Sequence, residues 1–133
     1  RGSLMRVIGE AGDRASRIEN RAGEPAANPY LFIAAQIAAG LDGLERGLSP
    51  GPSDDEPYQA EKPPLPGDLG AALKALDGSA FFRARFGDVF VDYYLRLKQA
   101  ELDRYAAYCQ DSGIDPAAGE VTPWEQNEYY DFF

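Results

Sequence analysis

Histidine is absent from the sequence, and a single cysteine occurs among its 133 residues. Without an imidazole, histidine-based acid–base catalysis and histidine metal ligation are excluded within this chain. The lone Cys109 cannot form an internal disulfide and offers no metal-ligand spacing, which is compatible with a reducing compartment. No apolar run reaches the length of a membrane span, and no signal-peptide pattern opens the chain. We therefore expect a cytoplasmic protein that does not bind membranes.

Positive charge is also scarce. Thirteen Lys and Arg residues stand against 22 Asp and Glu residues, and the formal net charge of −9 argues against nucleic acid as a partner. The apolar share of 44% suffices for the core of one domain, or of a piece of a larger one. The few cations are concentrated, because five arginines lie in the first 21 residues, and such a local basic segment is typical of an anion-binding site. These residues are Arg1, Arg6, Arg14, Arg17 and Arg21.

The first 26 residues have the pattern of a β-hairpin. Residues 3–8 and 16–22 read as two strands, and the intervening "GEAGDRA" has the Gly and Asp residues of a turn. After this hairpin the hydrophobic period changes from 2 to 3.6 residues. The change predicts that a helix follows.

A helix is predicted over residues 27–47, with Asn28 as its N-cap and Pro29 at its first position. Its apolar stripe is accompanied by alanines and a glycine, which let another backbone approach closely. We therefore expect this helix to be buried on more than one side. The stripe consists of Ile33, Ile37, Leu41 and Leu44.

The remaining chain divides into a proline-rich loop and a helical part. Residues 48–67 contain six prolines and an acidic cluster, which favours an irregular surface segment. Helical patterning resumes over 68–133, with a short helix at 68–77, a long amphipathic helix from residue 88, and a last helix N-capped by Thr122. The predicted fold class is α+β, a hairpin followed by about four helices.

The second strand carries a row of alternating charges. Arg17, Glu19 and Arg21 occupy every second position, so they project from one face about 6 to 7 Å apart. A solvated strand face with mutually neutralising charges would produce the same pattern. The arginines at positions 1 and 6, on the neighbouring strand, favour a functional interpretation. Several arginines around one carboxylate can bind phosphate oxygens while the carboxylate holds a divalent cation.

These residues also carry a family resemblance. The stretch "RIENRAGEPAANPYLFIAAQIAAGLDGLERGL" is similar to the C-terminal part of the catalytic domain of the glutamine synthetase family, and "RGSLMR" resembles an arginine-containing segment upstream of it. The resemblance is specific over residues 1–47 and weaker up to the terminal "WEQNEYY". It implies that the hairpin belongs to a larger sheet and that the chain is a fragment of a ligase. In that family, ATP and Mg²⁺ or Mn²⁺ support the formation of γ-glutamyl phosphate from glutamate, and ammonia then displaces phosphate.

The resemblance implies a role for each charged position. Glu19 resembles a metal ligand near the nucleotide phosphates, and Arg21 resembles the arginine that binds the carboxylate of glutamate. Arg1, Arg6 and Arg17 resemble arginines that contact ATP and its transferring phosphate, so Arg1 and Arg21 are the expected catalytic residues. The family's other metal ligands lie upstream of Arg1, so this chain alone is expected to be inactive. The family also implies a homo-oligomer.

Several alternatives stay open from the sequence. A γ-glutamyl amine or polyamine ligase of the same family would use an organic amine in place of ammonia, and "WEQNEYY" resembles such relatives. A catalytically silent structural or binding paralogue, or a helical interaction module without a ligand, would not need the charged row. Tyr58 lies where some bacterial members of the family carry a regulatory, adenylylated tyrosine, but an ordinary loop tyrosine would fit the same position.

Overall fold

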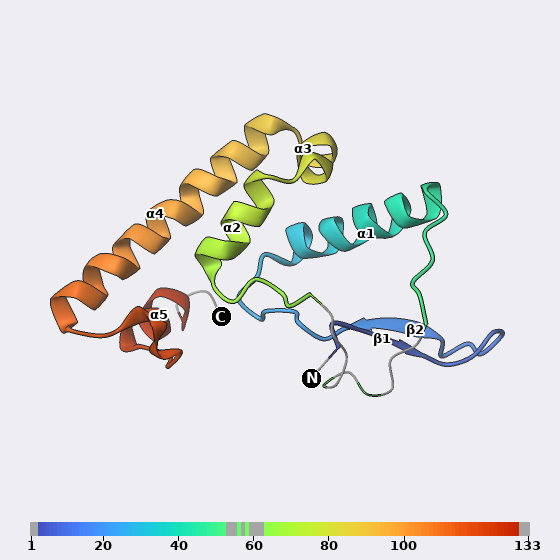
Figure 1. Ribbon diagram of the computed structural model, residues 1–133, viewed down its shortest axis with the longest axis horizontal. Helices are drawn as coiled ribbons and strands as arrows, with labels where there is room; N and C mark the ends of the chain where they lie inside the picture. The colour runs from blue at the N-terminus through green and yellow to red at the C-terminus, as the bar shows by residue number, and fades with distance from the viewer. Residues whose placement is uncertain (1–2, 53–55, 57, 59–62, 131–133) are drawn as a thin grey trace. The chain divides into compact units, whose positions relative to one another are not determined.

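The computed structural model describes residues 3–52, 56, 58 and 63–130 (Figure 1). The chain divides into two compact units, Arg1–Pro63 and Pro64–Phe133. In the described residues, the first unit contains a two-stranded sheet and one helix, and the second is helical. This combination confirms the predicted α+β class. Among the described residues, no helix has both the length and the apolar character needed to cross a membrane.

The first unit begins with the predicted hairpin. Strand β1 (Met5–Ile8) pairs antiparallel with β2 (Arg17–Asn20), and the hydrogen bond from the Arg21 N–H to the Leu4 carbonyl (2.8 Å) extends the pairing by one step. Both strands are shorter than the predicted 3–8 and 16–22. At the loop end only Ser16 is lost from the predicted strands, because its hydroxyl donates to the Glu10 carbonyl (2.7 Å) within the loop. The other differences, residues 3–4 and 21–22, lie at the opposite, open end of the hairpin.

The loop between the strands turns at Gly9, which has φ +88°. A Cβ there would lie 2.6 Å from Ser16 Oγ and 2.8 Å from Ser16 Cα. Both the backbone conformation and the lack of space therefore require glycine. The turn brings β2 back along β1 and so places Glu19 opposite Arg6.

Helix α1 (Pro29–Glu45) follows the hairpin and begins as predicted. Asn28 Oδ1 accepts hydrogen bonds from the N–H groups of Tyr30 (3.0 Å) and Leu31 (3.2 Å), and Pro29 occupies the first turn, where no N–H is needed. No residue of α1 is buried within the described chain. Burial of this helix on more than one side therefore stays a prediction about contacts beyond this chain. Its exposed apolar residues are Ile33, Ile37, Leu41 and Leu44.

Over residues 64–130, the second unit contains four α-helices and one 3₁₀ turn: α2 (Leu69–Asp77), α3 (Ala80–Phe86), α4 (Asp88–Ser112), η1 (Pro116–Ala118) and α5 (Pro123–Tyr130). Figure 1 shows α2 (green) running beside α4 (orange), with α5 (red) against the far end of α4. The hydrophobic core of this unit consists of Leu73, Val91 and Cys109. With α1, the described residues form five α-helices, one more than expected, because the short apolar segment before α4 is itself a helix.

Two N-caps explain where α3 and α5 begin. Ser79 Oγ accepts a hydrogen bond from the Phe82 N–H (3.2 Å) at the start of α3. At α5, Thr122 Oγ1 accepts from the Glu125 N–H (3.3 Å), and the Glu125 carboxylate accepts from the Thr122 N–H (2.7 Å). This reciprocal capping box confirms the predicted start of the last helix.

Candidate functional site

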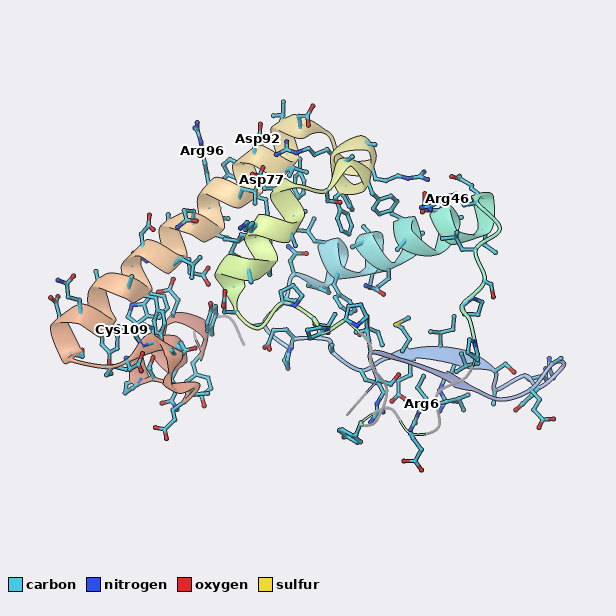
Figure 2. All side chains as sticks on the ribbon, in the orientation of Figure 1. Arg6, Arg46, Asp77, Asp92, Arg96 and Cys109 are labelled. Carbon is cyan, nitrogen blue, oxygen red and sulfur yellow. The ribbon has the colours of Figure 1, made fainter. Side chains whose placement is uncertain are left out.

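The hairpin presents its charged residues on one face. Arg6 lies directly opposite Glu19 in the strand register, and Arg6 Nε is 2.6 Å from Glu19 Oε2. Side chains alternate along a strand, so Arg17 belongs to the same face as Glu19. Arg21 lies one residue beyond β2, and its N–H bond to the Leu4 carbonyl continues the strand pairing to that position. The predicted row is therefore present, and the structure adds a direct ion pair across the two strands (Figure 2 labels Arg6).

The carboxylate of Glu19 is only partly satisfied. The side chain as a whole is 41% exposed, yet Oε2 is covered from solvent and accepts no hydrogen bond among the described residues. Its contact with Arg6 is thus an ion pair whose geometry falls outside that of a hydrogen bond. Because the side chain as a whole is partly exposed, its carboxylate still offers oxygen, the donor that Mg²⁺ and Mn²⁺ prefer. Glu19 therefore fits the role of a metal ligand.

One carboxylate does not complete a metal site. Across residues 3–52, 56, 58 and 63–130, the structure has no group of three or more Asp, Glu or Cys side chains placed to hold a metal ion. Glu19 could supply one ligand, and the others would come from outside the described residues.

The other predicted arginines differ in their surroundings. Arg17 is exposed, and its Nη1 donates to the Ala15 carbonyl (3.1 Å) at the end of the loop. Arg21 is half-buried just after β2. Arg1 lies outside the described residues. The structure thus brings Arg6 and Glu19 into contact, whereas Arg17 and Arg21 share their face without a contact to either.

Two residues that the sequence patterns did not single out connect the hairpin to α1. Asn20 Nδ2 donates to Gln36 Oε1 (3.1 Å), and Asn20 Oδ1 accepts from the Ala22 N–H (3.0 Å). The strand alternation places Asn20 on the face opposite to the charged row, which was a usable signal. Its partner on the helix could not be read from the periodicity.

The second unit has its own charged cluster around Arg83. This guanidinium contacts the carboxylates of Asp77 (2.6 Å), Asp88 (3.1 Å) and Asp92 (2.8 Å), and its Nε donates to the Asp77 carbonyl (3.0 Å). The hydrogen bonds to Asp92, Asp88 and Asp77 raise the pKa of Arg83 above its ordinary value. Because one cation joins the end of α2 to the start of α4, we interpret this cluster as structural.

An open groove of about 520 Å³ lies between α2 and α4. Charged residues of both signs line it, namely Lys74, Asp77, Asp92 and Arg96 (three of them labelled in Figure 2). Its two carboxylates are already paired with Arg83. Its lining residues belong to α2 and α4.

A second polar cluster fastens α5 to α4. Glu101 is 9% exposed as a residue, and its carboxylate accepts hydrogen bonds from Lys98 Nζ (2.7 Å) and from the Tyr129 hydroxyl. Burial alone would raise the pKa of Glu101, but the hydrogen bonds from Lys98 and Tyr129 more than offset it and hold that pKa below its ordinary value. Burial and the Glu101 carboxylate together raise the pKa of Tyr129. Lys98, Glu101 and Tyr129 thus hydrogen-bond to one another, and we interpret this cluster too as structural.

Tyr58 is exposed in the proline-rich segment. Its neighbours at 57 and 59–62 lie outside the described residues. Exposure is compatible with a modified tyrosine and with an ordinary one, so the regulatory interpretation stays a prediction.

Comparisons with known proteins bear on the whole chain. The family model described as "Glutamine synthetase, catalytic domain" matches residues 1–116. A γ-glutamylanilide synthase from Acinetobacter sp is 47% identical over 131 residues, which is 96% of this chain and 26% of that protein. A glutamine synthetase from Bradyrhizobium diazoefficiens is 39% identical over 115 residues, covering 79% of this chain and 24% of that protein. Lengsin from Canis lupus familiaris is 34% identical over 126 residues, covering 92% of this chain and 19% of that protein. The chain thus spans about a quarter or less of the length of these relatives.

Proposed function

The chain belongs to the glutamine synthetase family, and on that premise we propose that it forms the C-terminal part of the catalytic domain of an ATP-dependent glutamate–ammonia ligase. The observation that carries this proposal is the Arg6–Glu19 ion pair, on a strand face that two further arginines share. Such a face offers a carboxylate to a cation and guanidinium groups to anions. Phosphoryl transfer requires both, because negative charge must be neutralised as the phosphoryl group moves.

Glu19 is the residue that would hold Mg²⁺ or Mn²⁺, through its partly exposed carboxylate. When bound, the cation would supply positive charge that stabilises the negative charge of the phosphates of ATP. Arg6, already beside Glu19, would neutralise the phosphate oxygens nearest to this carboxylate, and Arg17 would bind a phosphate further along the strand. Arg1 would contact the transferring phosphate.

Arg21 would hold glutamate, since its guanidinium can bind a carboxylate through two parallel hydrogen bonds. In the proposed reaction, a side-chain carboxylate oxygen of glutamate bonds to the γ-phosphorus of ATP while the bond to ADP breaks. Ammonia then attacks the acyl carbon of γ-glutamyl phosphate and loses a proton, and phosphate leaves. The products are glutamine, ADP and phosphate.

The working enzyme would need more than this chain. Since the described residues supply one candidate metal ligand at the hairpin, we propose that the chain alone is inactive and acts within a larger polypeptide. We further propose a cytoplasmic homo-oligomer that uses small-molecule substrates.

A second candidate is a γ-glutamyl amine ligase of the same family. One observation favours it: the relative with 47% identity is named γ-glutamylanilide synthase, which places an aromatic amine where glutamine synthetase uses ammonia. The glutamate and nucleotide contacts would be the same in both enzymes. They would differ only in the amine pocket.

Release of phosphate from ATP tests both candidates in the ligase that contains this chain. The assay combines glutamate and Mg²⁺ or Mn²⁺ with ammonia, aniline, an alkylamine or a diamine in turn. The first proposal predicts the highest kcat/KM with ammonia, and the second predicts it with an organic amine. Absence of glutamate-dependent phosphate release with every amine would contradict both.

A further inference from the structure

The residue between the proposed metal ligand and the proposed glutamate-binding arginine is Asn20. Strand alternation directs its side chain away from the face that carries Glu19 and Arg21. On that opposite side it makes two hydrogen bonds: Nδ2 donates to Gln36 Oε1 on α1 (3.1 Å), and Oδ1 accepts from the Ala22 N–H (3.0 Å). One side chain thereby connects the strand to the helix and to the backbone that leaves the strand.

Both bonds act where the backbone has few other restraints. Strand β2 ends at Asn20, and the pairing with β1 continues for one more hydrogen bond, from the Arg21 N–H to the Leu4 carbonyl (2.8 Å). The bond to Ala22 closes a local turn around Arg21, which limits the directions its side chain can take. The bond to Gln36 holds the strand end against α1.

Hydrophobic packing contributes little to holding the end of β2 in place. No described residue in 3–52 belongs to the buried class, so the hairpin is not held in place by a hydrophobic core of its own. Close to the strand end, a Cβ added at Gly23 would lie 3.5 Å from the Phe32 ring, which shows that the chain passes directly over α1 there. The Asn20–Gln36 bond is therefore well placed to set the position of the strand end on the helix.

We propose that Asn20 and Gln36 are positioning residues that orient Glu19 and Arg21 toward the metal and glutamate. Neither side chain touches substrate in this scheme. Removing the pair lets the strand end shift on α1, and displacements of about 1 Å can reduce the rate by up to about 100-fold. This inference rests on the proposed ligase function.

The variants separate positioning from general stability. Gln36→Leu removes the helix bond at an exposed position, and Asn20→Leu removes both bonds. Gln36→Glu keeps an oxygen that can accept from Asn20 Nδ2, so it is the conservative variant. Gln99→Leu, the same substitution at an exposed position of α4, is the matched control.

In the ligase that contains this chain, we expect Gln36→Leu to raise the KM for glutamate and the Mn²⁺ concentration for half-maximal activity by about 3- to 10-fold, with a smaller change in the KM for ATP. Asn20→Leu should have a larger effect. The double variant should be no worse than Asn20→Leu, because Gln36 acts through Asn20. Gln36→Glu and Gln99→Leu should behave as the wild type.

Hydrogen exchange supplies a readout that does not depend on activity. The Ala22 amide, which donates to Asn20, should exchange faster in Asn20→Leu and in Gln36→Leu, and at the wild-type rate in Gln99→Leu. Unchanged Ala22 exchange, an equal rise of the KM for ATP and glutamate, or failure of Gln36→Glu to restore activity would overturn the inference. A wild-type ligase without glutamate-dependent phosphate release would instead contradict the proposed function, and the exchange result would still decide whether the pair positions the strand.

Discussion

Replacing Glu19 by glutamine separates the functional role of this residue from a structural one. Glu19→Gln keeps the size of the side chain and removes its charge, so the ion pair with Arg6 is lost. The two partners are 53% and 41% exposed, and Oε2 accepts no hydrogen bond within the described part of the chain. Exposed ion pairs contribute about 0 to 1 kcal/mol, so the free energy of unfolding should fall by less than about 1 kcal/mol.

The expected loss of activity is much larger. If Glu19 holds the cation, the variant loses a charged ligand at the site of phosphoryl transfer. Removing one such electrostatic contact lowers kcat by about 100-fold or more, equivalent to about 2.7 kcal/mol. If Glu19 only lies on a solvated strand face, the variant should lose the same small amount of stability and should keep its activity. The comparison of the two free energies therefore decides between the interpretations.

The assay measures ATP- and glutamate-dependent phosphate release by the ligase over a range of Mn²⁺ concentrations, alongside thermal unfolding. Glu10→Gln is the matched control, because Glu10 is an exposed carboxylate in the loop of the same hairpin. We expect the control to retain activity and Glu19→Gln to lose it at every limiting metal concentration. Near wild-type activity and metal dependence in Glu19→Gln would refute the assignment of Glu19 as a metal ligand.

Three further changes test other parts of the chain. Arg21→Ala should raise the KM for glutamate by about 10- to 100-fold in steady-state kinetics, since hydrogen bonds to charged groups contribute about 1.5 to 3 kcal/mol; an effect confined to ATP would contradict the role of this arginine. Because the folded-state pKa of Glu101 lies below its ordinary 4.5, the folded state binds fewer protons than the unfolded state near that pH. Stability should thus fall as the pH drops below this value, and urea unfolding of Glu101→Gln should show a weaker fall; equal slopes would exclude the effect. Val91→Ala should cost about 2 kcal/mol in the same assay, since Val91 is 1% exposed, while Val89→Ala at an 86% exposed position of the same helix should cost under about 0.5 kcal/mol.

The local features of this fold were readable from the sequence because they depend on neighbouring residues. The N-caps Asn28 and Thr122 combine an oxygen-bearing side chain with a following proline, and both helices begin there. The charged row on β2 follows from alternation alone. The pairing of Arg6 with Glu19 additionally needed the hairpin, whose turn residues were recognisable.

Features that depend on tertiary placement were not readable. Helix α3 spans seven residues, which is about two turns and too short for a helical period to distinguish it from a strand or loop. Asn20 and Gln36 are 16 positions apart, and Glu101 and Tyr129 are 28 apart. Such pairs follow from how helices and strands pack, and periodicity within one element contains no information on its partner.

The two units differ in what holds them, and this difference predicts how substitutions will act. The buried residues among those described are Leu73, Val91, Glu101, Cys109 and Thr122, all in the second unit. The proposed site lies on the hairpin of the first unit, where the charged side chains are exposed or half-buried and single charges contribute little to stability. Substitutions on the hairpin face should therefore change activity at nearly constant stability, whereas substitutions in the α2–α4 core should change stability first. If a hairpin variant lost activity only in proportion to its loss of stability, the substituted charge would have a structural role and not a functional one.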